Sequence, residues 1–583
     1  MQRSIVACVA SASLFASSPA FAQSVQDLTG LTALKDRLGA SAPTGAGVPL
    51  GQVEANAGGW TPDTTNPEFA GKTFTFKSPT PTPSGHATYV GQRWYGNSSS
   101  LAPGVTTIDC WDANGWLNNG FVNGTTATPP DLVTVKIFNN SWIGGGFGPN
   151  KLLRKVDYAV NAQGLIFCNG VNNGAGPLDV ALLSHMFNGL AVGRSDGQHR
   201  SGGTLAAIDQ PGRMKPEIVA PEGATSFSTP LVAGGATLLV ETARTLPALA
   251  SNPNAERPDV VRAVLMAGAE HRAGWTNNPA TSGPTRGSTA TPLDAVYGAD
   301  ELDVDHAHWI LAGAEQPAAS SAGTATDAPH AGWSLASSTS GSSLWWAFHV
   351  ESDKPIVSVL AAWNRDVALD FNSWTMPDHD LELWRVDSGT GQTTLVGDAG
   401  LPYFSGGNVQ SVSTVDNLEH LDLTGLVAGD YLLELRRPSD SLGAWNVAVA
   451  WELQCVTPLE YCVGKTTSLG QVPDLSAHGF ANVSANQFEL RVKNGVPNKT
   501  GVVFWGTQQN NAPFLGGTLC VKLPIVRLPV VTLDANGAVT VPLPLDPTMV
   551  GAKRDFQFWF RDPAHPDGTG VGLSDAVEVQ FCF

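Results

Sequence analysis

The sequence predicts an α/β domain with a parallel sheet, followed by two all-β domains of the sandwich or jelly-roll type. Three observations predict this order. Strand and helix patterns alternate in the first half of the chain. Short strand patterns separated by turn residues fill the second half. A chain of 583 residues is also too long for one hydrophobic core, so several domains are expected.

The first 22 residues predict a secretory signal. Arg3 supplies positive charge ahead of a short apolar run, and Ala20 and Ala22 form a small-x-small cleavage site. The apolar run is too short to span a membrane. We therefore assign residues 1–22 to a signal peptide, and we expect a protein that is secreted or held at the surface of a bacterium.

The region after the signal contains the pattern of a parallel sheet. Residues 132–138, LVTVKIF, form an apolar run with β-branched residues, as in a strand buried on both faces. Residues 151–164 have apolar positions at helical spacing and end at a glycine, and residues 165–168 predict the next strand. In such sheets the active residues lie at the carboxyl ends of the strands. We assign residues 23–315 to this domain.

The texture changes after residue 315. The small, polar segment 316–332 predicts a linker. Short strands then predict a sandwich or jelly-roll domain over 333–454 and a second β-domain of unknown role over 455–583. Within the latter, Asn-Gly at 536–537 predicts a hairpin turn. Candidate ligands for a structural Ca²⁺ on these β-turns are Asp380, Asp416 and Glu419.

Charge and cysteine content limit the classes of partner. The formal net charge of −18 argues against nucleic acid or an anionic membrane surface as a partner. Six of the seven cysteines remain after removal of the signal, and an even number in an exported chain permits disulfides. No Cys-x-x-Cys pair occurs, which argues against a zinc or redox site. We expect a monomer that binds neither nucleic acid nor membrane.

A serine at the start of an apolar helix raises the question of chemistry. Ser226 lies in GATSFSTPLVAGG (223–235), where its own N–H points outward from a helix N-terminus. Pro230 is tolerated there because N–H groups of the first turn lack partners. Such a serine is either a helix cap or a nucleophile, and a nucleophile needs a base to take its proton.

The segments around Ser226 and His86 resemble the two signature segments of the subtilisin-like serine peptidases. That family reads Gly-Thr-Ser-x-Ala-x-Pro-x-Val-Ala-Gly around its nucleophile and His-Gly-Thr-x-Val-Ala-Gly around its base. Here GATSFSTPLVAG and GHATYVG (85–91) stand in those places. The resemblance implies that Ser226 is the nucleophile and His86 the general base of a serine endopeptidase acting on proteins or peptides. It implies no cofactor for the chemistry.

Further segments follow in the family's order over residues 45–315. The segment 156–174 implies that Asn172 is the oxyanion asparagine, with Asn169 and Asn173 as close competitors. The segment IFNNSWIGGG (137–146) implies a substrate-binding edge, in which the substrate backbone pairs with the chain. That edge consists of Ser141, Trp142, Ile143 and Gly144. Segments 257–269 and 296–307 resemble the family's closing helix and Gly-rich end.

The acid of the triad departs from the family pattern. The family expects an apolar strand ending in Asp-x-Gly, whereas GVPLGQVEANAGGW offers Glu54 in that position. A glutamate can accept the Nδ1–H of His86, fix its tautomer and stabilise the imidazolium if the strand is set back by about one methylene. Asp63 is the alternative, but it follows a proline and does not end a strand. We predict a Ser-His-Glu triad.

Other functions remain open from sequence. A catalytically inactive scaffold of the same fold is motivated by the glutamate and by the short segment between Ala22 and the catalytic region, where many family members carry a longer pro-domain. An adhesion or glycan-binding protein is motivated by the β-domains and the 17 tryptophans. An acid-acting relative with a Glu–Asp–Ser site is disfavoured because His86 occupies the base motif.

Overall fold

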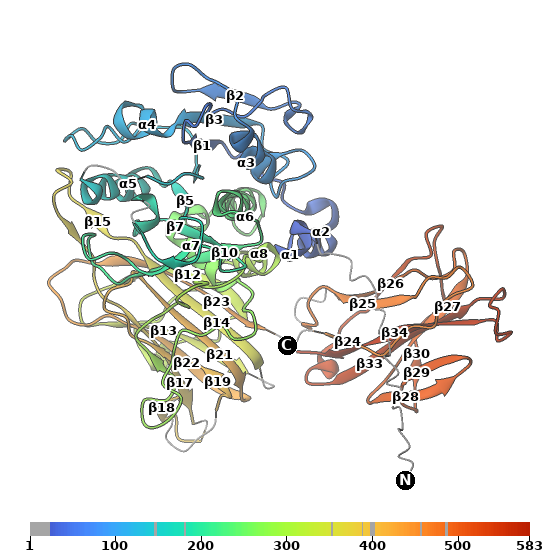
Figure 1. Cartoon of the computed structure of the whole chain (residues 1–583). Helices are drawn as coiled ribbons and strands as arrows, with labels where there is room; N and C mark the ends of the chain where they lie inside the picture. Colours follow the sequence, from blue (N-terminus) through green and yellow to red (C-terminus); the bar gives the residue numbers. More distant parts are fainter. Residues whose placement is uncertain are drawn as a thin grey trace, which may run out of the picture.

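The computed structural model describes residues 24–144, 148–179, 182–350, 354–387, 389–396, 403–454, 458–483 and 488–582. The predicted signal peptide and Cys455 lie outside these residues. Figure 1 shows an α/β part, a β-sandwich packed beneath it, and a C-terminal β part beside both.

The α/β part is built on a seven-stranded sheet in which every neighbouring pair of strands is parallel. Its order is β10-β7-β5-β4-β1-β3-β2. The strands are β1 (Leu50–Glu54), β2 (Thr73–Phe76), β3 (Thr107–Asp112), β4 (Ile137–Asn140), β5 (Ile166–Gly170), β7 (Leu190–Arg194) and β10 (Ile218–Ala220). A small separate sheet contains β6 (Gly176–Pro177), β8 (Arg200–Gly203) and β9 (Met214–Lys215). The predicted parallel α/β sheet is confirmed.

One helix, α6 (Thr225–Thr245), is buried along almost its whole length and packs against β4, β5 and β7. Gly234 permits this close packing, since a Cβ there would lie 2.8 Å from the Cβ of Leu101. The other helices are α1 (Val25–Leu28), α2 (Leu31–Leu38), α3 (Gly85–Tyr95), α4 (Ala113–Gly115), α5 (Pro149–Gln163), α7 (Pro258–Ala267) and α8 (Val304–Ala312). The core therefore fixes the position of α6, whose first turn carries Ser226.

The strand predicted over 132–138 has the wrong bounds. The chain joins the sheet only at Lys136, whose N–H donates to the carbonyl of Pro49 at 2.8 Å, and β4 begins at Ile137. Leu132 is 89% exposed, so the apolar run does not report burial there. The helix predicted over 151–164 and the strand predicted over 165–168 correspond to α5 and β5, with small shifts of their ends.

The middle of the chain forms two stacked sheets, with orders β11-β20-β17-β22-β13 and β12-β23-β14-β21-β19 and with β18 beside β17. Their strands are β11 (Ser288–Thr289), β12 (Ala331–Ser338), β13 (Ser343–Val350), β14 (Lys354–Trp363), β17 (Asp380–Val386), β18 (Thr393–Leu395), β19 (Gly406–Gly407), β20 (Gln410–Ser411), β21 (Leu418–Leu426), β22 (Gly429–Arg436) and β23 (Trp445–Gln454). A separate pair, β15 (Asp366–Val367) and β16 (Trp374–Thr375), lies beside α5.

The boundary between the first two parts is less sharp than the sequence predicts. The strand β11 comes from the α/β region but pairs with β20 of the sandwich. The predicted linker 316–332 runs along the sandwich, where Ala319 and Asp327 bridge to residues of β13. The helix α7 packs against β14 and β23, and one apolar cluster contains residues of both parts. The two parts share a core.

The C-terminal part contains a sheet of order β24-β34-β33-β27-β30 with β31 beside β27, a three-stranded sheet β25-β26-β32 and a hairpin β28-β29. Its strands are β24 (Leu459–Tyr461), β25 (Asp474–His478), β26 (Glu489–Lys493), β27 (Thr500–Gly506), β28 (Gln509–Phe514), β29 (Gly517–Val521), β30 (Val526–Arg527), β31 (Val531–Thr532), β32 (Val539–Pro542), β33 (Lys553–Arg561) and β34 (Val571–Gln580). The predicted turn at Asn536 and Gly537 reverses the chain, but the flanking strands pair elsewhere, β31 with β27 and β32 with β26. The predicted turn is therefore confirmed, with the N–H of Asp534 donating to the carbonyl of Ala538, but β31 and β32 do not form a ladder with each other.

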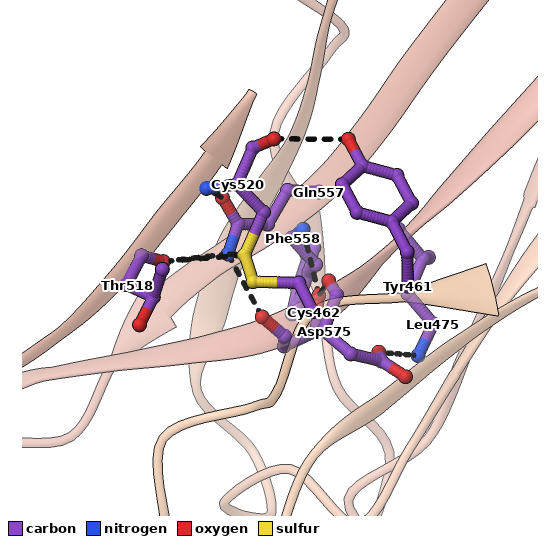
Figure 2. Close-up of a disulfide and its surroundings, with 9 residues drawn as sticks. Tyr461, Cys462, Leu475, Thr518, Cys520, Gln557, Phe558 and Asp575 are labelled. Carbon is purple, nitrogen blue, oxygen red and sulfur yellow. Dashed lines mark hydrogen bonds between the residues drawn. A yellow bond between two sulfur atoms is a disulfide. The ribbon is translucent and has the colours of Figure 1, made fainter. Parts of the chain in front are cut away.

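A disulfide joins Cys462 to Cys520 within this part, next to Tyr461, whose hydroxyl donates to the carbonyl of Cys520 at 2.9 Å (Figure 2). Cys110 and Cys168 are free and buried in the α/β sheet. Phe480 packs on Trp309 of α8 with ring centroids 4.8 Å apart, which places the C-terminal part against the helices of the first part. None of the helices in the described part of the chain has the length and apolar character that a membrane crossing needs.

Candidate active site

Glu54 and His86 form a hydrogen-bonded pair at the carboxyl edge of the parallel sheet. Glu54 is the last residue of β1 and is 1% exposed. His86 lies in the first turn of α3, which Ser84 caps by accepting the N–H of Ala87. The Nδ1 of His86 lies 2.8 Å from Oε2 of Glu54. When this nitrogen carries the proton, Nε2 of the ring is left free to accept another.

The environment couples the protonation of these two groups. The hydrogen bond from Glu54, together with its charge, raises the pKa of His86, against the opposing effect of partial burial. Burial raises the pKa of Glu54, while hydrogen bonds from His86 and Gln52 oppose that rise. The buried carboxylate therefore favours a protonated imidazole, which is the state a general base reaches after it accepts a proton.

Ser226 lies in the first turn of α6, one residue after the helix begins. N–H groups of a first turn have no partner within the helix, and the helix dipole adds partial positive charge. The carbonyl of Ser226 accepts the hydroxyl of Ser141 at 2.8 Å, which ties the start of α6 to the segment after β4. The N–H groups of Thr225 and Phe227 already have partners, in Asn173 and Ala224, whereas the N–H of Ser226 has none among the described residues.

A cavity of about 280 Å³ brings the candidate residues together. It is lined by Ala55, Ala57, Ser84, His86, Ser141, Trp142, Ile143, Gly170, Val171, Asn173, Thr225 and Ser226. The lining comes from the loops after β1, β4 and β5 and from the starts of α3 and α6. An imidazole and a serine hydroxyl therefore face one cavity at the carboxyl edge of the sheet.

The predicted substrate-binding edge follows β4 and borders the cavity in part. Ser141 and Trp142 are almost fully buried, whereas Ile143 is 48% exposed. The indole of Trp142 donates to Oδ1 of Asn140 at 3.1 Å, which holds its ring in place. Gly144 is outside the lining, and its carbonyl accepts the N–H of Leu182. Three of the four predicted residues therefore border the cavity.

The structure separates the neighbouring asparagines of the loop after β5. The amide of Asn172 donates to Asp179 at 2.7 Å, and Asn172 is not part of the cavity lining. Asn173 lines the cavity, and its Oδ1 accepts the N–H of Thr225 at 2.9 Å. Asn169 is buried and hydrogen-bonded to Asn140. The geometry thus favours Asn173, which the sequence offered only as a competitor of Asn172.

The remaining acidic candidates lie in other surroundings. Asp63 accepts the N–H and hydroxyl of Thr65, so its carboxylate serves a local turn. Asp380 pairs with Arg436 at 2.6 Å, Asp416 accepts the N–H of Met214, and Glu419 accepts the N–H of Ser413. The carboxylates named above as candidate calcium ligands are thus each bound to donors of the protein itself.

Two functional candidates were missed from the sequence. Gln52 and Tyr95 are buried beside Glu54 and hydrogen-bond to one another. The signal was present, because a glutamine two residues before Glu54 in a buried strand points to the same face.

A larger cleft of about 570 Å³, between α7 and the sandwich, has no histidine or cysteine among its lining residues. Size alone therefore does not identify the site.

Comparison with known proteins gives matches only at the level of structure. No family model and no curated protein matches the chain. A cold adapted subtilisin-like serine proteinase is 17% identical, with 45% of this chain and 90% of that chain covered at a TM-score of 0.30. A lanthipeptide protease is 14% identical, with 48% and 95% covered at 0.31. The serine protease MycP1 of a type VII secretion system is 15% identical, with 49% and 87% covered at 0.28. Such scores carry no assignment of activity, which has to be argued from the site.

Proposed function

We propose that this chain is a secreted serine endopeptidase that cleaves peptide bonds through an acyl-enzyme. One observation carries the proposal: the Glu54–His86 hydrogen bond holds a histidine in the same cavity that contains Ser226 at the start of a buried helix. A structural histidine would not need an exposed ring, yet His86 lines the cavity and its side chain is 42% exposed. The predicted signal peptide and the disulfide support export.

The three side chains would act in sequence. Ser226 attacks the peptide carbonyl carbon as its proton passes to Nε2 of His86, and the imidazolium is stabilised by the carboxylate of Glu54. The same proton then passes to the leaving amine when the peptide bond breaks. Water then hydrolyses the resulting ester: His86 takes a proton from the water as it attacks and returns it to the oxygen of Ser226. Substrates of this chemistry are proteins or peptides, and the chemistry itself uses no cofactor.

The negative charge that develops on the carbonyl oxygen needs donors. We assign that role to the N–H of Ser226 and to the amide of Asn173, in place of Asn172. Asn173 lines the cavity, its oxygen accepts the N–H of Thr225, and its Nδ2 has no partner among the described residues. Donors fixed before the reaction stabilise the transition state without reorganisation.

The test uses an active-site probe on the full chain. A fluorophosphonate forms a covalent bond with an activated serine, so it should label the wild type and fail to label Ser226→Ala. Ser228→Ala is the matched control, because its hydroxyl lies in the same helix but donates to the carbonyl of Ala220 at 2.8 Å. It should be labelled like the wild type. If the folded wild type is not labelled and cleaves no unfolded protein substrate, the inactive-scaffold alternative holds instead.

A further inference from the structure

We infer that Gln52, held by Tyr95, is a positioning residue that orients the Glu54 carboxylate toward His86. This inference rests on the proposed peptidase function. It concerns two residues behind the triad that touch neither the cavity nor a substrate. Both are 0% exposed, and both come from elements that also carry a triad residue, β1 and α3.

Every hydrogen-bonding group of the Gln52 side chain faces a partner. Its Nε2 donates to Oε1 of Glu54 at 2.9 Å and to the carbonyl of Ala87 at 2.9 Å. Its Oε1 accepts the hydroxyl of Tyr95 in a short hydrogen bond. If the amide turned over, its oxygen would meet the carboxylate and the carbonyl, and both are acceptors. The two acceptors therefore fix which end of the amide faces Glu54, and the Tyr95 hydroxyl binds the other end.

This arrangement divides the two oxygens of the carboxylate between two tasks. Oε2 of Glu54 faces Nδ1 of His86, and Oε1 faces Gln52. A glutamate has one more rotatable bond than an aspartate, so its carboxylate needs a second contact to keep one orientation. Gln52 also binds the carbonyl of Ala87, the residue after His86. It thereby links the strand that carries the acid to the helix that carries the base.

Electrostatics gives Gln52 a second effect on the same carboxylate. Burial of Glu54 disfavours its charged form, and the donor from Gln52 favours that form. Other titratable groups around it are the Tyr95 hydroxyl and the Cys110 thiol, and burial raises the pKa of both well above their ordinary values. Both are therefore neutral when the enzyme works, and the charge of Glu54 acts on the titration of His86, whose pKa it raises.

The test compares kcat, KM and the pH dependence of kcat for wild type, Gln52→Met and Tyr95→Phe in the full chain. Gln52→Met keeps the length but removes the donor to a charged group, so kcat should fall about 10- to 100-fold with KM nearly unchanged. Glu54 then becomes neutral more readily, the pKa of His86 falls, and the acid limb of the profile moves to lower pH. Tyr95→Phe should lower kcat about two- to tenfold in the same way.

A double variant and a control separate positioning from general stability. Because Tyr95 acts through Gln52, adding Tyr95→Phe to Gln52→Met should lower kcat no further. Tyr461→Phe removes a hydroxyl bonded to Cys520 in the C-terminal part and should leave kcat and the acid limb unchanged. If Gln52→Met does not fold, the pH profile of Tyr95→Phe tests the inference: an acid limb at lower pH than in the wild type supports it, and an unchanged acid limb overturns it.

Failure of the inference can be told apart from failure of the proposed function. A wild type that is labelled and active, with variants that keep its kcat and its acid limb, overturns the role of Gln52. A loss of rate that tracks a loss of thermal stability, with no movement of the acid limb, overturns it too. A wild type that is neither labelled nor active overturns the peptidase assignment instead.

Discussion

Replacing Arg365 should destabilise the α/β part although the residue belongs to the sandwich. Its guanidinium is fully buried and lies between two carboxylates of the first part. Nε donates to Asp157 at 2.7 Å and Nη1 donates to Asp209 at 2.8 Å. Asp209 keeps a second cation, Arg154. Asp157 is fully buried and would keep no direct ion pair in the described part of the chain, only N–H donors and the longer-range charge of other buried cations.

The magnitude follows from that difference. Removing one partner of a buried ion pair leaves an uncompensated charge and costs about 3–5 kcal/mol. Arg365→Met should lower the free energy of unfolding by that amount. With an unfolding entropy of about 2.1 cal/mol/K per residue over both parts, Tm falls by about 3–6 °C. Arg244→Met is the matched control, because its side chain and that of its partner Glu256 are 37% and 33% exposed, so their ion pair contributes about 0–1 kcal/mol.

Differential scanning calorimetry of the full chain, with urea titration, measures both variants. Because the two parts share one apolar cluster, we expect them to unfold in one transition that moves as a unit in Arg365→Met. The reasoning is refuted if Arg365→Met melts at the temperature of Arg244→Met. It is refuted equally if the sandwich melts first and leaves the α/β part folded.

Three further predictions concern the site and the disulfide. Glu54→Gln should lower kcat by a factor of about 10⁴ and move the acid limb of the pH profile to lower pH. The reason is that Glu54 raises the pKa of His86 above the ordinary histidine value of about 6.5, and this effect is lost in the variant; a pH series of peptide hydrolysis measures both changes. Asn173→Ala should lower kcat about 10²–10³-fold and Asn172→Ala far less, and equal losses in steady-state assays would contradict the assignment. Cys462→Ser opens a loop of 58 residues and should cost up to about 4 kcal/mol of C-terminal stability in urea, while the rate of fluorophosphonate labelling stays unchanged.

The features that sequence predicted well are local. A helix pattern preceded by small residues is enough to place Ser226 in the first turn of α6. The end of an apolar strand pattern is likewise enough to place Glu54 at the end of β1. The alternation of strand and helix likewise indicates a parallel sheet without knowledge of distant contacts. The β4 bounds failed because an apolar run can precede a strand on the surface, as Leu132 does.

The features that sequence could not settle depend on distant contacts. Asn172 and Asn173 are adjacent residues of the same type. The contact that distinguishes them is the hydrogen bond from the N–H of Thr225 to Asn173, which joins residues 52 positions apart in the chain. The contacts of the predicted linker could not be foreseen for a similar reason, because small polar residues suit both a linker and an irregular edge of a sandwich. Composition alone does not show that Asp327 bridges to β13.

The placement of Glu54, His86 and Ser226 explains how the proposed triad could use a longer acid. Glu54 ends a strand, while His86 and Ser226 each lie in the first turn of a helix. At such ends the core fixes the backbone, while the side chain extends beyond the regular part of the strand or helix. An added methylene therefore changes only the local path of one buried side chain, and a neighbour on the same strand can constrain that path. Gln52 is two residues away on the same face, which is the nearest position from which a donor can reach the carboxylate without entering the cavity.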